Sequence, residues 1–219
     1  MVSGAPGSPD GATLGSADGT ELGSAEGAGL ESAEAPGSAE DAGLAPVHEA
    51  IEPLDGPYVH LRPATAADRD ALVAVIADPW VARWWQTEDA EDDVAEMLGD
   101  NELALWMIEA DGRVIGLIQA VEETEPQYRH ASIDIAIVEA GQGRGLGPDA
   151  VRTVARWLID VRGHHRLTID PSTENERAIR TYAGVGFRPV GVLRAYERWR
   201  DGAWHDGLLM DLVATDLVR

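Results

Sequence analysis

The sequence GQGRGLGPDAVRTVARWL, residues 141–158, places four glycines in its first seven positions. The residues that follow have apolar side chains at helical spacing, which predicts a glycine loop leading into an amphipathic helix. Glycines let an anion approach the backbone closely, and the free N–H groups and the dipole of a helix N-terminus favour negative charge. The stretch therefore predicts a binding site for a phosphate-like group.

The spacing of the glycines distinguishes between known phosphate loops. A dinucleotide-binding loop has the pattern G-x-G-x-x-G, whereas Gly143, Gly145 and Gly147 are each two residues apart. A nucleoside-triphosphate loop ends in Gly-Lys-Ser/Thr, and this chain contains no lysine. Residues 142–147 instead satisfy Q-x-x-G-x-G, which resembles the pyrophosphate loop of the GNAT acetyltransferases. We expect Pro148 at the first helical position, where it removes one N–H donor.

A second stretch, DPSTENERAIRTYAGVGFRPVG at residues 170–191, strengthens this resemblance. It is similar to the second GNAT signature, an Asn followed by a helix with a Tyr and then Gly-Phe. The resemblance covers residues 59–213 and implies acetyl-coenzyme A as co-substrate, with no metal. It also implies a strand N–H within 136–138 that stabilises the oxyanion. The cofactor-binding residues that it implies are Ala136, Ile137, Val138, Gln142, Gly143, Arg144, Gly145, Leu146, Gly147, Asn175, Ala178 and Tyr182.

Local patterns along the chain predict the same fold class. Alternating or continuous apolar runs predict strands at 58–65, 102–123, 131–140, 165–171 and 188–213. Asp111-Gly112 and Asp201-Gly202 predict hairpin turns within two of these runs. Helices are predicted over 65–78, 79–98 and from Ser172, which we expect to be an N-cap. Together these elements predict an α+β fold, a single GNAT domain whose mixed central sheet is flanked by helices.

Residues 1–55 have a different composition from the rest of the chain. They contain 11 acidic residues and no lysine, arginine or aromatic residue. Such a segment cannot bury enough apolar surface to offset the entropy of ordering, so we predict a disordered acidic tail over 1–55. The domain is predicted over 56–219, with 17 arginines against 28 acidic residues and a net charge of −11.

Composition also bounds the function and the partners. An acidic domain disfavours nucleic acid and suits a small cationic amine substrate. No apolar run reaches the roughly 18 residues of a membrane span, and no secretory or mitochondrial signal pattern is present. Without cysteine there is no disulfide and no thiolate metal site. We expect a soluble cytoplasmic protein, monomeric or homodimeric.

The acceptor side resembles the aminoglycoside 6′-N-acetyltransferases, which confer antibiotic resistance. The resemblance is carried by residues 121–147 and 168–187, by the Trp pair after Arg83, and by a glutamine at 119. It implies that Asp134 and Asp170 hold an aminoglycoside ammonium and that Asp134 takes its proton, because an amine must lose a proton before it attacks a thioester. It implies that Tyr182 is the general acid. The other acceptor residues it implies are Trp84, Trp85 and Gln119.

Several alternatives stay open at this point. Asp134 could be the structural partner of an arginine, Asp170 a turn residue, Tyr182 a half-buried aromatic, and the two tryptophans part of the core. Residues 191–213 resemble the protein N-terminal and ribosomal-protein acetyltransferases more than the drug-modifying ones. A protein N-terminal alanine or serine, a polyamine or a siderophore precursor is therefore an alternative acceptor. A binding module that has lost catalysis is a further alternative.

Overall fold

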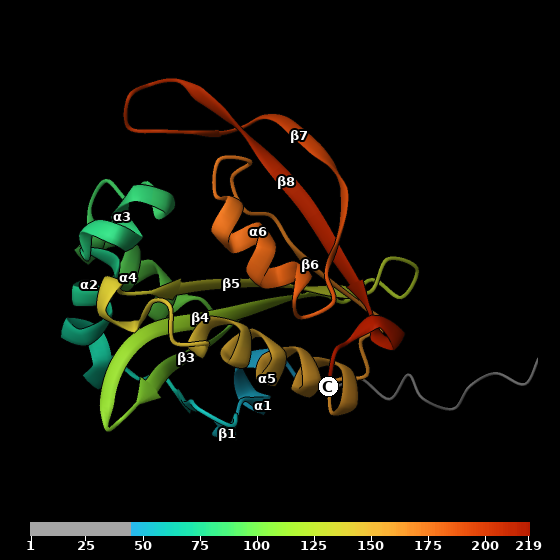
Figure 1. Cartoon of the computed structure of the whole chain (residues 1–219). Helices are drawn as coiled ribbons and strands as arrows, with labels where there is room; N and C mark the ends of the chain where they lie inside the picture. Colours follow the sequence, from blue (N-terminus) through green and yellow to red (C-terminus); the bar gives the residue numbers. More distant parts are fainter. Residues whose placement is uncertain (1–44) are drawn as a thin grey trace, which may run out of the picture. The chain divides into compact units, whose positions relative to one another are not determined.

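The computed structural model describes residues 45–219 (Figure 1). Within this range eight strands form one sheet in the order β1-β2-β3-β4-β5-β6-β8-β7. The pair β5–β6 is parallel and the other neighbouring pairs are antiparallel, which confirms the predicted mixed sheet. The strands are β1 (Leu54–Asp55), β2 (His60–Pro63), β3 (Leu103–Ala110), β4 (Arg113–Glu123), β5 (His130–Ile137), β6 (Arg166–Ile169), β7 (Arg188–Arg198) and β8 (Trp204–Val213).

Helices cover both faces of this sheet. One apolar cluster includes buried side chains of α5 and α6, and a second includes those of α2, α3 and α4. Strand β3 contributes alternate residues to the two clusters, which explains why its sequence is continuously apolar. The helices are α1 (Val47–Ala50), α2 (Arg69–Ile76), α3 (Pro79–Trp85), α4 (Ala90–Gly99), α5 (Leu146–Asp160) and α6 (Glu176–Ala183), with short 3-10 turns η1 (Ala66–Asp68), η2 (Glu139–Gly141) and η3 (Ala214–Asp216).

The two predicted hairpin turns are present. Asp111 and Gly112 have φ of 52° and 72°, the left-handed pair that a two-residue turn with right-handed strand twist requires. They join β3 to β4, which pair in antiparallel register. The second hairpin joins β7 to β8 around Asp201-Gly202, and in Figure 1 it arches above α6 toward α3.

The sheet opens between β5 and β6, and this opening positions the functional site. Only Ala131 and Ser132 of β5 pair with β6, whereas β5 continues to Ile137. On the other side of β5, the N–H of Val138 donates to Ile115 O of β4 at 3.0 Å. Because N–H directions alternate along a strand, the N–H groups of Ile135 and Ile137 point into the opening.

The N-terminal boundary of the domain lies earlier than the predicted position between residues 55 and 56. Residues 47–55 form α1 and β1, and Val47 is buried. The main-chain carbonyl of Glu52 accepts a hydrogen bond from Trp106 Nε1 at 2.9 Å, and its carboxylate accepts one from Trp157 Nε1 at 3.2 Å. The prediction was wrong here because a few apolar residues among acids give no periodic signal. The predicted disorder of residues 1–44 lies outside the described residues.

From residue 45 onward, no helix has both the length and the apolar character needed to cross a membrane. The same range holds no group of three or more His, Asp or Glu side chains placed to bind a metal ion.

Candidate active site

The glycine loop follows the short turn η2 after β5 and leads directly into α5. Gly143 and Gly145 have φ of 78° and 77°, a conformation that side chains rarely adopt, and this explains the glycines at both positions. In the described part of the chain, the N–H groups of residues 143–147 donate to no backbone carbonyl. They remain available to an anion, as predicted from the glycine spacing.

The start of α5 differs from the sequence prediction. The helix begins at Leu146 with Gly145 as its N-cap, so Pro148 is the third helical residue and not the first. The next N–H, that of Asp149, already donates to Gly145 O at 3.3 Å. The loop must therefore supply anion donors from residues before the proline.

Side-chain hydrogen bonds fix the loop against its neighbours. Gln142 Nε2 donates to Ile137 O at 2.7 Å, across the opening beside β5. Asp78 caps α3 by accepting from Trp80 N at 3.0 Å, and it also lies 3.4 Å from the donor Glu139 N. The N-terminus of α3 is thus attached to the turn that precedes the glycine loop.

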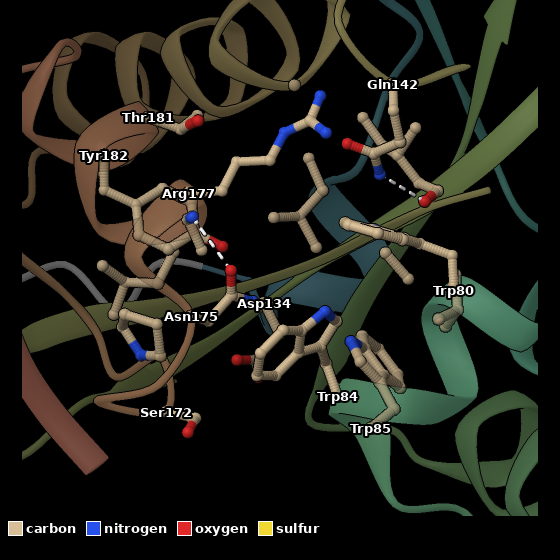
Figure 2. Close-up of a pocket in the computed structure, with 18 of the residues that line it drawn as sticks. Trp80, Trp84, Trp85, Asp134, Gln142, Ser172, Asn175, Arg177, Thr181 and Tyr182 are labelled. Carbon is tan, nitrogen blue, oxygen red and sulfur yellow. Dashed lines mark hydrogen bonds between the residues drawn. The ribbon is translucent and has the colours of Figure 1, made fainter. Parts of the chain in front are cut away.

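A cavity of about 570 Å³ opens beside the loop (Figure 2). Two predicted site residues do not line it. Val138 directs its N–H to β4, and the Arg144 side chain pairs with Asp111 at 2.5 Å. The predicted residues that line the cavity are Trp84, Trp85, Gln119, Asp134, Ala136, Ile137, Gln142, Gly143, Gly145, Leu146, Gly147, Asp170, Asn175, Ala178 and Tyr182.

Asp134 and Asp170 occupy equivalent positions relative to the last paired residues of β5 and β6. Ser132 of β5 pairs with Thr168 of β6; Asp134 lies two residues further along β5, and Asp170 lies two residues after Thr168, directly beyond the end of β6. Because side chains alternate with a period of two, both carboxyl groups project to the same side of the sheet. Both line the cavity, so the structure brings together two acids that are 36 residues apart in the sequence.

The Asp134 carboxylate is accessible from the cavity, yet protein groups surround it closely. Burial raises the pKa of Asp134 from 3.8 to about 6; the negative charge of Asp170 adds to this rise, and the hydrogen bond from Gln119 opposes it. The Gln119 Nε2 to Asp134 Oδ2 distance is 3.4 Å. No arginine is hydrogen-bonded to Asp134 among the described residues, so the structural-partner alternative does not apply to it.

Tyr196 of β7 is a site residue that the sequence prediction missed. Its hydroxyl donates to Asp170 Oδ2 in a short hydrogen bond. This hydrogen bond is the main cause that raises the pKa of Tyr196 to about 12, with burial adding to it. Tyr196 therefore stays protonated and holds the Asp170 carboxylate in place.

Tyr182 lies on α6 with its side chain buried in the cavity wall. Its ring packs edge-on against Phe187 at 6.3 Å between centroids. A Cβ on Gly186 would lie 2.3 Å from Asp216 O, so the Gly-Phe pair permits the close turn that seats Phe187. Burial raises the pKa of Tyr182, and the charges of Asp134 and Asp170 raise it further.

The N-cap of α6 is Asn175 and not the predicted Ser172. Asn175 Oδ1 accepts from Ala178 N at 3.1 Å, as drawn in Figure 2. The Ser172 hydroxyl instead accepts from Glu174 N at 3.2 Å, within the preceding turn. This cap occupies one of the two lone pairs of the Asn175 carbonyl oxygen and leaves the amide nitrogen as a donor for a ligand.

An aromatic wall closes the cavity on the α3 side. Trp84 and Trp85 line the cavity, and Trp84 packs edge-on against Trp199 at 6.3 Å between ring centroids. Trp199 in turn stacks on His205 at 3.7 Å. The indole Nε1 of Trp84 is buried with no hydrogen-bond partner among the described residues. Both tryptophans therefore line the site wall, and Trp85 also packs against the apolar cluster of α2, α3 and α4, so the core alternative holds in part for Trp85.

Comparison with known protein families identifies the family to which the chain belongs. Residues 59–188, more than half of the chain, match the acetyltransferase (GNAT) domain family. The chain belongs to the GNAT acetyltransferases. This confirms the family and the fold class predicted from the two signatures. As a member of the family, the protein is an acetyl-coenzyme A-dependent N-acetyltransferase, and the alternative of a module without catalysis is set aside.

The relatives of this GNAT chain differ in the amine that they acetylate. It is 28% identical over 155 residues to aminoglycoside N(6′)-acetyltransferase type 1 of Klebsiella pneumoniae, covering 62% of the chain and 76% of that protein. It is 27% identical over 158 residues to spermidine N(1)-acetyltransferase of Escherichia coli (strain K12), covering 69% and 84%. AAC(6')-Ib in complex with ribostamycin and coenzyme A superposes with a TM-score of 0.60 at 25% identity, covering 73% and 95%.

Proposed function

We propose that this acetyltransferase transfers acetyl from acetyl-coenzyme A to the 6′-amino group of an aminoglycoside. The observation that carries the proposal is the convergence of Asp134 and Asp170 in one cavity with the glycine loop and Tyr182. A cavity with two carboxylates suits an acceptor that is both cationic and an amine. The relation to an aminoglycoside acetyltransferase supports this choice of acceptor.

The residues at the opening of the sheet fit the cofactor. Acetyl-coenzyme A supplies the acetyl group as a thioester. The free N–H groups of residues 143–147 are placed to bind its pyrophosphate. The N–H of Ile137 points into the opening and is the donor within 136–138 that can stabilise the oxyanion, because Val138 already donates to β4.

Proton transfer at the acceptor falls to Asp134. A carboxylate whose pKa is about 6 is a better general base near neutral pH than an ordinary aspartate. Asp134 binds the ammonium with Asp170 and takes one proton, which leaves the amine nitrogen free to attack the thioester carbon. The C–N bond forms, and the C–S bond then breaks.

Tyr182 returns a proton to the departing sulfur. The charges of Asp134 and Asp170 help to keep this hydroxyl protonated in the free enzyme. A bound ammonium offsets both charges, so Tyr182 becomes a stronger acid when the acceptor is in place. The proton taken by Asp134 leaves to solvent, and the second proton, which the nitrogen loses as the amide forms, restores the Tyr182 hydroxyl. The products are the acetamide and free coenzyme A.

A polyamine is the second candidate acceptor. The relation to a spermidine acetyltransferase covers a larger share of this chain than the relation to the aminoglycoside enzyme. Glu197 adds a third carboxylate to the cavity wall, which suits an extended chain of ammonium groups as well as a sugar.

The deciding experiment measures thiol release from acetyl-coenzyme A with four acceptors: kanamycin, tobramycin, spermidine and a peptide that begins with alanine or serine. Saturable release with the aminoglycosides, with the acetyl group at the 6′ nitrogen by NMR, is the expected result. Asp134→Asn serves as the control and should lose at least about 100-fold in turnover. Release with spermidine alone or with the peptide alone would refute the aminoglycoside and leave the acetyltransferase chemistry in place.

A further inference from the structure

We propose that Arg177 is a second, cationic arm of the cofactor site, which binds the pyrophosphate of coenzyme A beside the glycine loop. This inference rests on the acetyl-coenzyme A chemistry proposed above. Neither GNAT signature as read from the sequence assigned a role to Arg177, which lies on α6 between Asn175 and Ala178.

The position of the guanidinium points to the loop. A Cβ built on Gly143 would lie 3.8 Å from Arg177 Nη2, so the guanidinium is next to the loop backbone. The Arg177 carbon Cζ also lies 5.7 Å from the centre of the Trp80 ring, a cation–π distance. Figure 2 shows the side chain extending from α6 into the cavity in the direction of Gln142.

The charges lining the cavity are segregated. Arg177 is the one basic residue in the wall that the described residues form, and it lies at the loop end. The acidic residues in that wall are Asp134, Asp170 and Glu197. None of the ion pairs in residues 45–219 includes Arg177, whereas the neighbouring Arg180 pairs with Glu176 at 3.0 Å. The cavity therefore holds an unpaired cation where the glycine loop receives an anion.

The start of α5 gives a reason for such a cation. A helix N-terminus normally offers its first N–H groups to a bound phosphate. Pro148 has none, so α5 offers one donor fewer than an ordinary helix start. A planar guanidinium can supply two donors and a full positive charge in its place. The cation–π contact with Trp80 of α3 helps to position it.

The test is calorimetric binding of coenzyme A, dephospho-coenzyme A and pantetheine to the full chain and to its variants. Arg177→Ala should weaken coenzyme A and dephospho-coenzyme A by about 10- to 100-fold, as expected for loss of charge-assisted hydrogen bonds. It should leave the weak binding of pantetheine, which has no phosphate, unchanged. Arg177→Lys should recover part of the loss. Arg180→Ala, one turn away and exposed, is the matched control and should bind all three ligands as the wild type does.

Each other outcome overturns the proposal. Unchanged coenzyme A binding by Arg177→Ala would remove this side chain from the site. A loss confined to coenzyme A, with dephospho-coenzyme A unaffected, would assign Arg177 to the 3′-phosphate instead. An equal loss for pantetheine would indicate a structural effect on α6. If the wild type binds no coenzyme A, the proposed function fails as well, and that result is separate from all the others.

Discussion

Removal of the Asp170 charge should move the pH dependence of catalysis toward acid. In the wild type the acid limb of kcat/KM should lie at about pH 6, because Asp134 must be deprotonated to act as base. The pKa of Asp134 rises from 3.8 to about 6, and burial is a larger cause of that rise than the charge of Asp170. Asp170→Asn should therefore lower the acid limb by about 1 unit, the usual size of the effect of one neighbouring charge.

The assay is initial-rate kcat/KM for the preferred amine between pH 4.5 and 8.5, at saturating acetyl-coenzyme A. Maximal activity of Asp170→Asn should fall as well, because one contact to the ammonium is lost. Glu197→Gln is the matched control: it also removes an acid from the cavity wall, but Glu197 does not contribute to the Asp134 shift. An acid limb that stays at the wild-type position in Asp170→Asn, or one that persists in Asp134→Asn, would refute this account of the base.

Three further predictions concern other parts of the molecule. Tyr182→Phe keeps the ring packed on Phe187 but removes the proton donor, so kcat should fall about 100-fold or more. The affinity for coenzyme A, measured by calorimetry, should stay within twofold of the wild type. A kcat equal to that of the wild type would exclude Tyr182 as the general acid. Gly145→Ala should weaken coenzyme A binding, because a side chain at φ 77° costs about 1–2 kcal/mol and so disfavours the loop conformation that presents the free N–H groups. Gly99→Ala, with open space and no such backbone conformation, is the control. Glu122→Gln should reduce the urea unfolding free energy at pH 7 by about 3–5 kcal/mol, because Arg162 is left buried without its carboxylate. The pKa of Glu122 is lowered from 4.5 to about 2, so the ion pair contributes its full stability above pH 4.5. The difference in unfolding free energy between wild type and variant should therefore shrink as the pH falls toward 2. A difference that does not change with pH would contradict the ion-pair explanation.

Local chemistry made the loop and the hairpins predictable. Gly143 and Gly145 adopt the left-handed backbone that their residue type anticipates, and Asp111-Gly112 forms the turn expected of it. These features depend on a few neighbouring residues, so the sequence alone defines them. The position of Pro148 in α5 was missed because the helix starts within the glycine run, where no capping side chain marks the boundary.

The residues that the sequence did not predict are those brought to the site by distant elements. Tyr196 reaches Asp170 from β7, 26 residues further along the chain, and Arg177 meets Trp80 of α3 across the cavity. Neither pair has a characteristic spacing, because the arrangement of β7 and α3 around the sheet determines the contact. From the sequence alone, an arginine on a short polar helix is expected to be a surface residue; its contact with Trp80 becomes evident only when the cavity wall formed by α3 is known.

The opening between β5 and β6 links the two halves of the site. Asp134 and Asp170 lie two residues beyond Ser132 and Thr168, the last pair of the parallel register. Where that pairing ends, β5 is left with N–H groups that face no neighbouring strand, and the two acids face a cavity instead of a packed interior. In the function proposed above, the same break in the sheet thus provides hydrogen-bond donors for the cofactor and carboxylates for the amine. The register between β5 and β6 places both acids on one side of the sheet, because a shift of one residue would turn one of them to the other face. No single sequence motif contains this register.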